Sequence, residues 1–241
     1  MNVVGKTDVG LVREINEDYF SVTDCAGGKL CVLCDGMGGH NAGEVASKIA
    51  AETISGYLVE NLAQNMSDDD IATHFDNAIK KANDEVLKVA DLNPQNEGMG
   101  TTVVIALFVD NVLFLSHVGD SRCYLIREGV LIGLTKDHSL MQQMLDNGEI
   151  SEDSIENFPF KNVITRCIGT SEGVSGDFAI FETETDDIIL MCSDGLTNYC
   201  SSEDIVYAVI GDSFEESADR LVEKAKDGGG GDNITVVLIQ N

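Results

Sequence analysis

The most distinctive hydrophobic pattern in the chain is an unbroken apolar run, Leu30–Cys34, with neither a helical nor an alternating period. A run this short predicts a strand buried on both faces. It stops at Asp35, and Gly36 and Gly38 follow, where glycine lets the backbone turn sharply and approach a neighbour closely. We therefore expect Asp35 at the mouth between a strand and a helix. Because Asp-Gly is also common in ordinary turns, this pair alone does not separate a turn from a ligand site.

Two long stretches, Ala42–Leu62 and Asp68–Val89, have apolar residues at helical spacing. The second follows Ser67, a residue type that caps helix N-termini, and begins with three aspartates, which the helix dipole favours. The first helix should bury Val45, Ala46, Ile49, Ala50, Thr53, Tyr57 and Leu58, and the second should bury Ile71, Phe75, Ala78, Ile79, Ala82, Val86 and Val89.

The remaining β-rich runs are short and are bounded by turn residues. The four runs between residues 101 and 134 are separated only by short turns, which predicts an antiparallel meander. Residues 151–170 include Pro159 and have no regular apolar period, so we expect a mobile surface segment there. The order of strands, two helices, further strands, helices and a last strand indicates the α+β class. The predicted strands are Val3–Leu11, Tyr19–Thr23, Leu30–Cys34, Thr101–Val109, Val112–His117, Arg122–Ile126, Val130–Leu134, Phe178–Phe181, Ile188–Cys192 and Ile234–Ile239, and the further helices are Asp137–Asn147, Ser201–Ile210 and Phe214–Lys226.

Composition favours a single domain spanning residues 1–241, because hydrophobic residues make up 43% of the chain and no proline-rich or glycine/serine-rich linker divides it. The formal net charge is −27. Such a charge argues against nucleic acid and anionic membranes as partners and favours cations and basic protein surfaces. No apolar run approaches the ~20 residues of a membrane span, and the first residues lack a signal-peptide core. We expect a cytoplasmic protein.

The seven cysteines are scattered along the chain, and several lie inside apolar runs. Cys31 and Cys34 have C-x-x-C spacing, but residues three apart on a strand point to opposite faces. Zinc binding and redox chemistry at this pair are therefore not expected. A cysteine nucleophile is not expected either, since Cys123 and Cys167 have no arginine six residues further on.

Carboxylates recur at the ends of apolar strands from distant parts of the chain: Asp35, Asp120, Asp194 and Asp232. If the fold brings these ends together, like charges so close require cations to stay ionised. A donor set of oxygens alone suits Mg²⁺ or Mn²⁺, and two such ions can lower the pKa of a bridging water. The alternative is four independent turn aspartates.

Arg13 lies beside several acids, ahead of a predicted strand. Its planar guanidinium can hold two oxygens of a phosphoryl group in a way that lysine cannot. The alternative is a surface arginine paired with Glu14 or Glu17, since such pairs are common and weak.

Six short motifs occur in order between residues 13 and 237: R-E-I-N-E-D, D-G-M-G-G-H, G-M-G-T-T, V-G-D-S-R, C-S-D-G-L and G-G-D-N-I-T-V-V. They cover nearly the whole chain and resemble the motifs of the metal-dependent protein phosphatases, the type 2C serine/threonine phosphatases, in their compact bacterial form. The resemblance implies an α+β, four-layer α/β/β/α sandwich, with two antiparallel sheets flanked by helix pairs. It also implies hydrolysis of phosphoserine and phosphothreonine by direct attack of a hydroxide that bridges two metal ions.

The alternative function is that of a non-catalytic relative of the same fold, which binds phosphoproteins or a regulator. Such a relative would have lost a metal ligand, and every expected acid is present in this chain.

The resemblance also implies roles for individual carboxylates. Asp35 would bridge two Mn²⁺ or Mg²⁺ ions, and the carbonyl of Gly36 would complete one of them. Asp194 and Asp232 would hold the other ion. Asp120 would hold a third, weaker ion together with Asp194.

The neighbouring residues receive roles in the same way. Arg13 would bind the phosphate, and Glu17 and Asp18 would act largely through metal-bound water. Many eukaryotic relatives carry a histidine general acid directly after the D-G pair, where this chain has Met37. His40 is a candidate in its place, and water on the third metal is the rival proton donor.

In the family, the region matching residues 151–170 is a flap beside the catalytic centre that influences substrate choice. Phe158 and Phe160 could contact a substrate, or they could pin the loop to the core. Lys161 and Arg166 are positive charges that could attract a phosphorylated substrate to an acidic protein. The implied partners are phosphorylated proteins, among them a cognate serine/threonine kinase, and we expect the protein to be a monomer.

Overall fold

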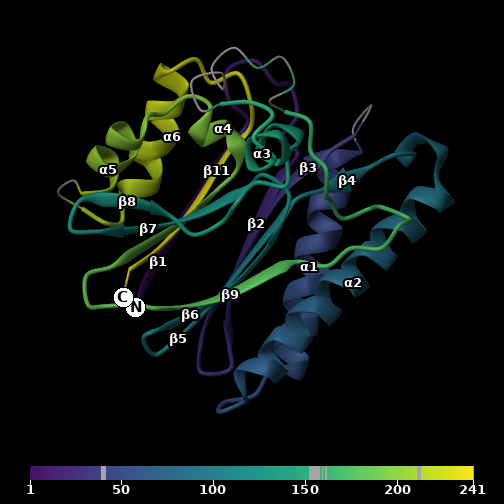
Figure 1. Cartoon of the computed structure of the whole chain (residues 1–241), viewed down its shortest axis with the longest axis horizontal. Helices are drawn as coiled ribbons and strands as arrows, with labels where there is room; N and C mark the ends of the chain where they lie inside the picture. The colour runs from purple at the N-terminus through teal and green to yellow at the C-terminus, as the bar shows by residue number, and fades with distance from the viewer. Residues whose placement is uncertain (39–41, 152–157, 159, 161, 211–212, 241) are drawn as a thin grey trace.

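The computed structural model describes residues 1–38, 42–151, 158, 160, 162–210 and 213–240. Its strands form two antiparallel sheets (Figure 1). The larger sheet has the order β2-β3-β5-β6-β9, with β4 paired to β3, and the smaller has the order β1-β11-β10-β7-β8. The larger sheet contains β2 (Asp18–Cys25), β3 (Gly28–Met37), β4 (Gly100–Thr101), β5 (Val103–Val109), β6 (Val112–Val118) and β9 (Asp177–Glu182). The smaller contains β1 (Asn2–Asp8), β7 (Arg122–Arg127), β8 (Val130–Gly133), β10 (Ile188–Cys192) and β11 (Ile234–Gln240).

The helices lie on the two outer faces and at one end of the sheets (Figure 1). The long pair α1 and α2 covers the larger sheet, and α5 and α6 cover the smaller one. No helix within the described residues is both long enough and apolar enough to cross a membrane. The helices are α1 (Gly43–Asn61), α2 (Asp68–Leu92), α3 (Leu140–Asp146), α4 (Asp194–Thr197), α5 (Ser202–Val209) and α6 (Ser217–Asp227), with a 3₁₀ turn at Pro94–Asn96.

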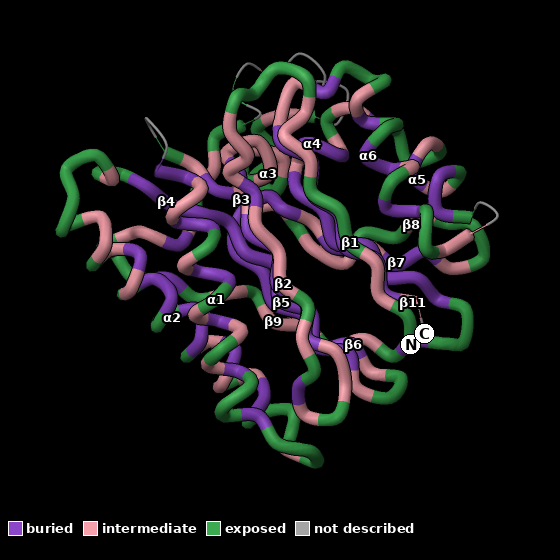
Figure 2. The backbone as a smooth tube through the Cα atoms, turned by 180° about the vertical axis from the view of Figure 1, so that it is seen from behind, coloured by how far each residue is buried: buried purple, intermediate pink, exposed green. Residues whose placement is uncertain are grey.

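Three separate hydrophobic cores show that the molecule has four layers. One core joins α1 and α2 to the larger sheet, one fills the space between the sheets, and one joins the smaller sheet to α4, α5 and α6. The central strands are accordingly buried over most of their length, whereas the edge strands β1, β2, β8 and β9 are not (Figure 2). The buried strands are β3, β5, β6, β10 and β11. The four-layer α/β/β/α sandwich of the α+β class is confirmed.

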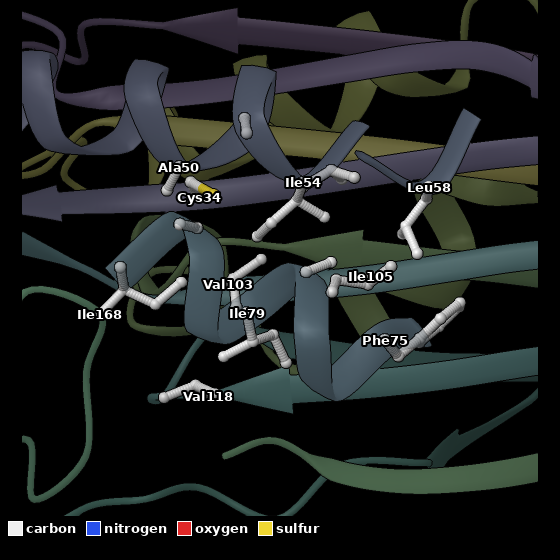
Figure 3. Packing of buried hydrophobic residues seen from close by; sticks show 14 of the residues in the cluster. Cys34, Ala50, Ile54, Leu58, Phe75, Ile79, Val103, Ile105, Val118 and Ile168 are labelled. Atoms are coloured by element: carbon white, nitrogen blue, oxygen red, sulfur yellow. The ribbon is translucent and has the colours of Figure 1, made fainter. Parts of the chain in front are cut away.

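The core beneath α1 and α2 is broader than a single helical stripe. Figure 3 shows Ile54 and Leu58 of α1 and Phe75 and Ile79 of α2 packed around Ile105 of β5. The stripe predicted for α2 is confirmed except at its last residue, Val89, and Ser67 caps the helix as expected. In α1 the prediction is partly wrong: Ile54 and Ala51 are fully buried, while Val45, Ile49 and Tyr57 are only partly buried. The reason is that α1 contacts both the sheet and α2, so its buried face is wider.

The predicted meander is wrong at its centre. β5 pairs with β6 in the larger sheet, whereas β7 pairs with β8 in the smaller one. The chain changes sheets at Gly119, whose φ of +107° lies in the region that favours glycine. A Cβ there would stand 2.6 Å from the Thr102 side chain. A short connection therefore turns a corner here instead of closing a hairpin.

Other boundaries differ for local reasons. The helix expected from Asp137 begins at Leu140, because Asp137 instead forms a two-point ion pair with Arg122 (2.8 and 2.7 Å). Cys34 lies in the core on the helix side and Cys31 in the core between the sheets, as expected for residues three apart on a strand. The interval 152–157 and residues 159 and 161, within the predicted mobile segment, lie outside the described residues.

Candidate metal centre

The strand ends that carry the acidic motifs meet at one end of the sandwich, around a polar cavity of about 220 Å³. The cavity lies where β3 finishes, β11 begins and β10 passes into α4. The side chains around it therefore come from segments far apart in the sequence. Its walls are formed by Arg13, Glu17, Asp35, Gly36, Met37, Gly38, Asp120, Asn162, Ile164, Asp194, Asp232 and Asn233.

Asp35 lies inside β3, which continues to Met37, and not in the turn that was expected to follow the apolar run. Its backbone is tied to the next motif on both sides: its N–H donates to Thr102 Oγ1 (3.0 Å), and its carbonyl accepts from Thr101 Oγ1 (2.9 Å) and from the Thr102 N–H (2.9 Å). The two threonines of G-M-G-T-T thus hold this carboxylate's backbone in place.

Asp18 lies on β2 directly opposite Asp35 in the antiparallel register. Its carboxylate is buried; Oδ2 accepts from Ser193 Oγ (2.8 Å), whereas Oδ1 is buried without a hydrogen-bond partner. Burial, opposed by the hydroxyl donors of Thr235 and Ser193, raises the pKa of Asp18 to about 7. A buried carboxylate oxygen without a donor is costly, which indicates a place for a proton or a cation.

The other carboxylates share this electrostatic state. Burial, and then the charge of Asp194, raises the pKa of Asp120 to about 7. Burial, and then the charge of Asp18, raises the pKa of Asp35 well above its ordinary value. The pKa of Asp194 is also raised, by burial and then by Asp232. Raised carboxylate pKa values from desolvation plus like charges are typical of functional sites.

Asp232 is the carboxylate that already has a cationic partner. Arg13 Nη2 lies 2.8 Å from Asp232 Oδ2, and Arg13 Nη1 lies 3.8 Å from Glu17 Oε2. The Arg13 side chain is 46% exposed at the cavity mouth. Arg13 is therefore paired with acids, as the second alternative stated, although its nearer partner is Asp232. Its role in phosphate binding stays a prediction.

The backbone around Gly36 is packed too closely for any side chain. A Cβ at this position would collide with the carbonyl oxygens of Gly43 and Glu17. The Gly36 N–H donates to the Glu17 carbonyl at 3.1 Å. Glycine at this position thus allows β3, the Arg13–Glu17 segment and the start of α1 to pack closely against one another.

Two polar residues inside the motifs hold the site together, and motif reading singled out neither. Asn233 Nδ2 donates to the carbonyls of Val9 and Ile15 (3.0 and 2.9 Å), and its Oδ1 accepts from the Glu17 N–H (2.9 Å). Ser193 bonds Asp18 and accepts from the Thr235 N–H (3.0 Å). Their place beside the motif aspartates, in C-S-D-G and G-D-N, was the available signal.

Seven of the nine predicted site residues line the cavity, and Asp18 is buried on the neighbouring strand opposite one of them, Asp35. His40 lies outside the described residues. The alternative of four unrelated turn aspartates is wrong, because the four share one cavity. The seven are Arg13, Glu17, Asp35, Gly36, Asp120, Asp194 and Asp232.

The chemistry of this donor set fits Mg²⁺ or Mn²⁺, since its candidate ligands are carboxylate and carbonyl oxygens. The unpartnered Asp18 Oδ1 and the raised pKa values indicate negative charge that lacks compensation. Across the described ranges, no three acidic, histidine or cysteine side chains already form a finished coordination shell. One oxygen of Asp232 is engaged by Arg13.

Comparisons with known proteins agree with this site. The family model described as Protein phosphatase 2C matches residues 12–228. The serine/threonine phosphatase stp of Listeria monocytogenes is 36% identical over 242 residues, which cover 100% of this chain and 96% of stp. The solved structure of the S. agalactiae serine/threonine phosphatase has a TM-score of 0.93 and 31% identity, covering 99% of this chain and 98% of that one.

A further solved structure is that of the catalytic domain of the serine/threonine protein phosphatase PstP in complex with two manganese ions. It has a TM-score of 0.84 and 37% identity, and the match covers 98% of this chain and 96% of that one. The ordered motifs, the two-sheet sandwich and the full-length relatives all agree, and the chain belongs to the protein phosphatase 2C family.

Proposed function

We propose that this chain is a metal-dependent phosphatase that hydrolyses phosphoserine and phosphothreonine in proteins. The observation that carries the proposal is the meeting of all four strand-end aspartates with Arg13 in one cavity. Family membership and relatives named serine/threonine phosphatases support the same reaction.

Two divalent ions are proposed as cofactors, in line with the two manganese ions of the PstP structure. Asp35, Asp194, Asp232 and the Gly36 carbonyl would hold them, and Asp120 with Asp194 would hold a third, weaker ion. When bound, Mn²⁺ or Mg²⁺ supplies a water of lowered pKa as nucleophile and neutralises charge on the phosphoryl oxygens.

The chain's own residues bind and orient the phosphoryl group. Arg13 offers it two N–H donors in a planar fork, and to do so it turns away from Asp232 Oδ2, which now lies 2.8 Å from one of its nitrogens. Ser193 keeps the buried Asp18 carboxylate in a single orientation, and Asn233 keeps the Glu17 backbone against the cavity.

The cavity's size limits what it recognises. Its volume of about 220 Å³ suits a phosphoryl group together with metal ions. The rest of a protein substrate would lie outside the cavity, beside Asn162 and Ile164 of the flap, which line it.

The departing serine or threonine oxygen needs a proton donor, for which there are two candidates. Met37 lines the cavity and has no acidic proton, so it cannot take the place of a histidine there. His40 stays a candidate, outside the described residues, and metal-bound water is its rival.

We further propose phosphorylated proteins as partners, including a serine/threonine kinase, and a single catalytic unit spanning residues 1–241 that acts as a cytoplasmic monomer. The seven cysteines are free thiols, six of them buried, as is usual in reducing compartments. A non-catalytic binding protein of the same fold is disfavoured because no expected acid is missing.

The test uses the purified chain and p-nitrophenyl phosphate. Hydrolysis should depend on Mn²⁺, stop in EDTA and return when Mn²⁺ is restored. A protein that binds Mn²⁺ and phosphopeptides but releases no nitrophenol would support the binding-protein reading instead.

A further inference from the structure

A pair of buried histidines lies outside the catalytic cavity and has no part in the proposed reaction. His117 comes from β6 and His138 from the segment before α3, and their rings are stacked with centroids 4.6 Å apart and planes 16° apart. His117 Nε2 donates to the Lys136 carbonyl at 2.8 Å. This bond ties the backbone two residues before His138 to β6. Two buried imidazoles can simply fill space in the core, so their hydrogen bonds must show whether they have a further role.

His138 binds both main-chain groups of Gly119. Its own N–H donates to the Gly119 carbonyl (2.9 Å), and its Nδ1 accepts from the Gly119 N–H (3.1 Å). Burial, and then His117, holds the pKa of His138 below its ordinary value, so the ring is neutral near pH 7 and Nδ1 is available as an acceptor. Gly119 is the residue directly before Asp120.

The other neighbour of Asp120 is held just as firmly. Ser121 Oγ lies 2.7 Å from Thr102 Oγ1, the same hydroxyl that accepts from the Asp35 N–H. Asp120 therefore stands between two fixed residues, with His138 as the anchor on one side and Thr102 on the other. Without His138, the buried Gly119 N–H would lose its only acceptor among the described residues.

The same residue also anchors the end of the flap. The His138 carbonyl accepts from the Thr165 N–H (2.8 Å), and Leu140 donates to the Val163 carbonyl (2.8 Å) across an antiparallel bridge. Ile164, between these two bonds, lines the catalytic cavity. One residue thus contacts both the backbone that carries Asp120 and the backbone that carries a wall of the cavity.

A side-chain contact adds to this link. His138 Nε2 lies 3.2 Å from Asp177 Oδ2, although without the alignment of a hydrogen bond, and Asp177 Oδ1 accepts from Arg166 Nη1 (2.6 Å). Arg166, expected to be a free cation for substrate, is therefore engaged in an ion pair.

We propose that His138 is a positioning residue that sets the carboxylate of Asp120 and the cavity-lining end of the flap relative to one another. This proposal rests on the proposed function only for the readout that measures phosphatase activity.

Two substitutions of His138 distinguish a positioning role from simple core filling. If His138 is a positioning residue, Phe should be more damaging than Asn, and if it only fills the core, Asn should be more damaging than Phe. His138→Phe keeps the ring and its stacking on His117 but removes the Nδ1 acceptor. His138→Asn loses the ring but places an amide oxygen near the position of Nδ1. His74→Asn, at a half-buried histidine of α2 that bonds Tyr57, is the matched control.

The first readout is amide hydrogen exchange in the metal-free protein, followed by NMR. Since a buried donor without a partner costs about 1–3 kcal/mol, protection of the Gly119 amide should fall roughly tenfold or more in His138→Phe and less than about threefold in His138→Asn. The Thr165 amide should show the same ranking, because the two segments are coupled.

The second readout is the Mn²⁺ concentration that half-saturates hydrolysis. It should rise about tenfold in His138→Phe and stay within about threefold of wild type in His138→Asn, and saturating Mn²⁺ should restore most of the rate. His74→Asn should change neither readout.

Greater loss of Gly119 protection in the Asn variant than in the Phe variant would overturn the proposal in favour of core filling. Loss at Gly119 with unchanged protection at Thr165 would overturn the coupling. A wild-type chain without phosphatase activity would instead refute the proposed function, and the exchange measurement would still decide the role of His138.

Discussion

Replacing Arg13 with alanine separates phosphate binding from metal binding. A charge-assisted fork to a phosphoryl group contributes about 1.5–3 kcal/mol, so kcat/KM for a phosphothreonine peptide should fall roughly ten- to a hundredfold. Loss of the ion pair between Arg13 and Asp232 should not weaken Mn²⁺ binding. Both side chains are partly exposed, at 46% and 27%, so the pair is worth at most about 1 kcal/mol. Its loss frees a carboxylate and leaves Mn²⁺ affinity unchanged or up to about fivefold tighter.

The assay combines steady-state hydrolysis at saturating Mn²⁺ with calorimetric titration of Mn²⁺. Arg13→Lys is the matched control, because it keeps the charge but loses the planar fork, and it should recover only part of kcat/KM. A kcat/KM within threefold of wild type, or Mn²⁺ binding weakened more than tenfold, would show that Arg13 is a structural ion-pair partner.

Three further predictions follow from the electrostatics of the site. Because the pKa values of Asp18 and Asp120 are raised to about 7 from 3.8, the folded metal-free protein binds more protons than the unfolded chain between these values, and its stability falls as pH rises through about 7. The melting temperature in EDTA should thus be lower at pH 8.0 than at pH 6.5, with Mn²⁺ reversing the loss; a rise in EDTA would refute the assignment. Asp35→Asn should raise the melting temperature in EDTA, since it removes a buried charge among like charges, and a lowered value would count against that repulsion. Replacing Lys161 with serine should lower kcat/KM for a phosphoprotein by about three- to tenfold while sparing phenyl phosphate, and Arg166→Ser should have a smaller effect because Arg166 is already paired with Asp177; equal losses on both substrates would exclude a role in selection.

Periodicity and strand-end chemistry predicted most of the architecture. The unbroken run before Asp35 is a strand buried on both faces, as its lack of period indicated, because sheets pack against a helix layer on one side and against another sheet on the other. The boundaries failed where side chains compete with local propensity. Asp137 would have opened a helix, but its two bonds to Arg122 hold it in the loop.

The change of sheet at Gly119 could not be read from the sequence, because V-G-D-S-R is equally consistent with a hairpin turn. Only the packing of Thr102 and His138 around that glycine makes it a corner. The aspartates were found because acidic residues recur at the ends of four apolar strands and lie within motifs that resemble those of a known family. The residues that orient them, Ser193 and Asn233, are common polar types whose role depends on tertiary contacts.

Residue types alone did not predict the side-chain contacts of the flap. Phe158 and Phe160 contact each other edge to face, with centroids 6.1 Å apart, and Phe160 stays 56% exposed. The alternative in which both phenylalanines pin the loop to the core is therefore wrong for Phe160. The partner of Arg166, Asp177, is eleven residues away on β9, a pairing with no local sequence signal.

One paired measurement decides whether the carboxylate cluster hydrolyses phosphoprotein esters with bound divalent ions. Phosphate release from a phosphothreonine peptide is followed with Mn²⁺ for the wild type and for Asp35→Asn, with circular dichroism to confirm that both are folded. We expect sustained turnover by the wild type, abolished by EDTA, and no turnover above background by the variant. A folded Asp35→Asn protein that releases phosphate at a near-normal rate, or a wild-type rate unaffected by EDTA, would contradict this expectation.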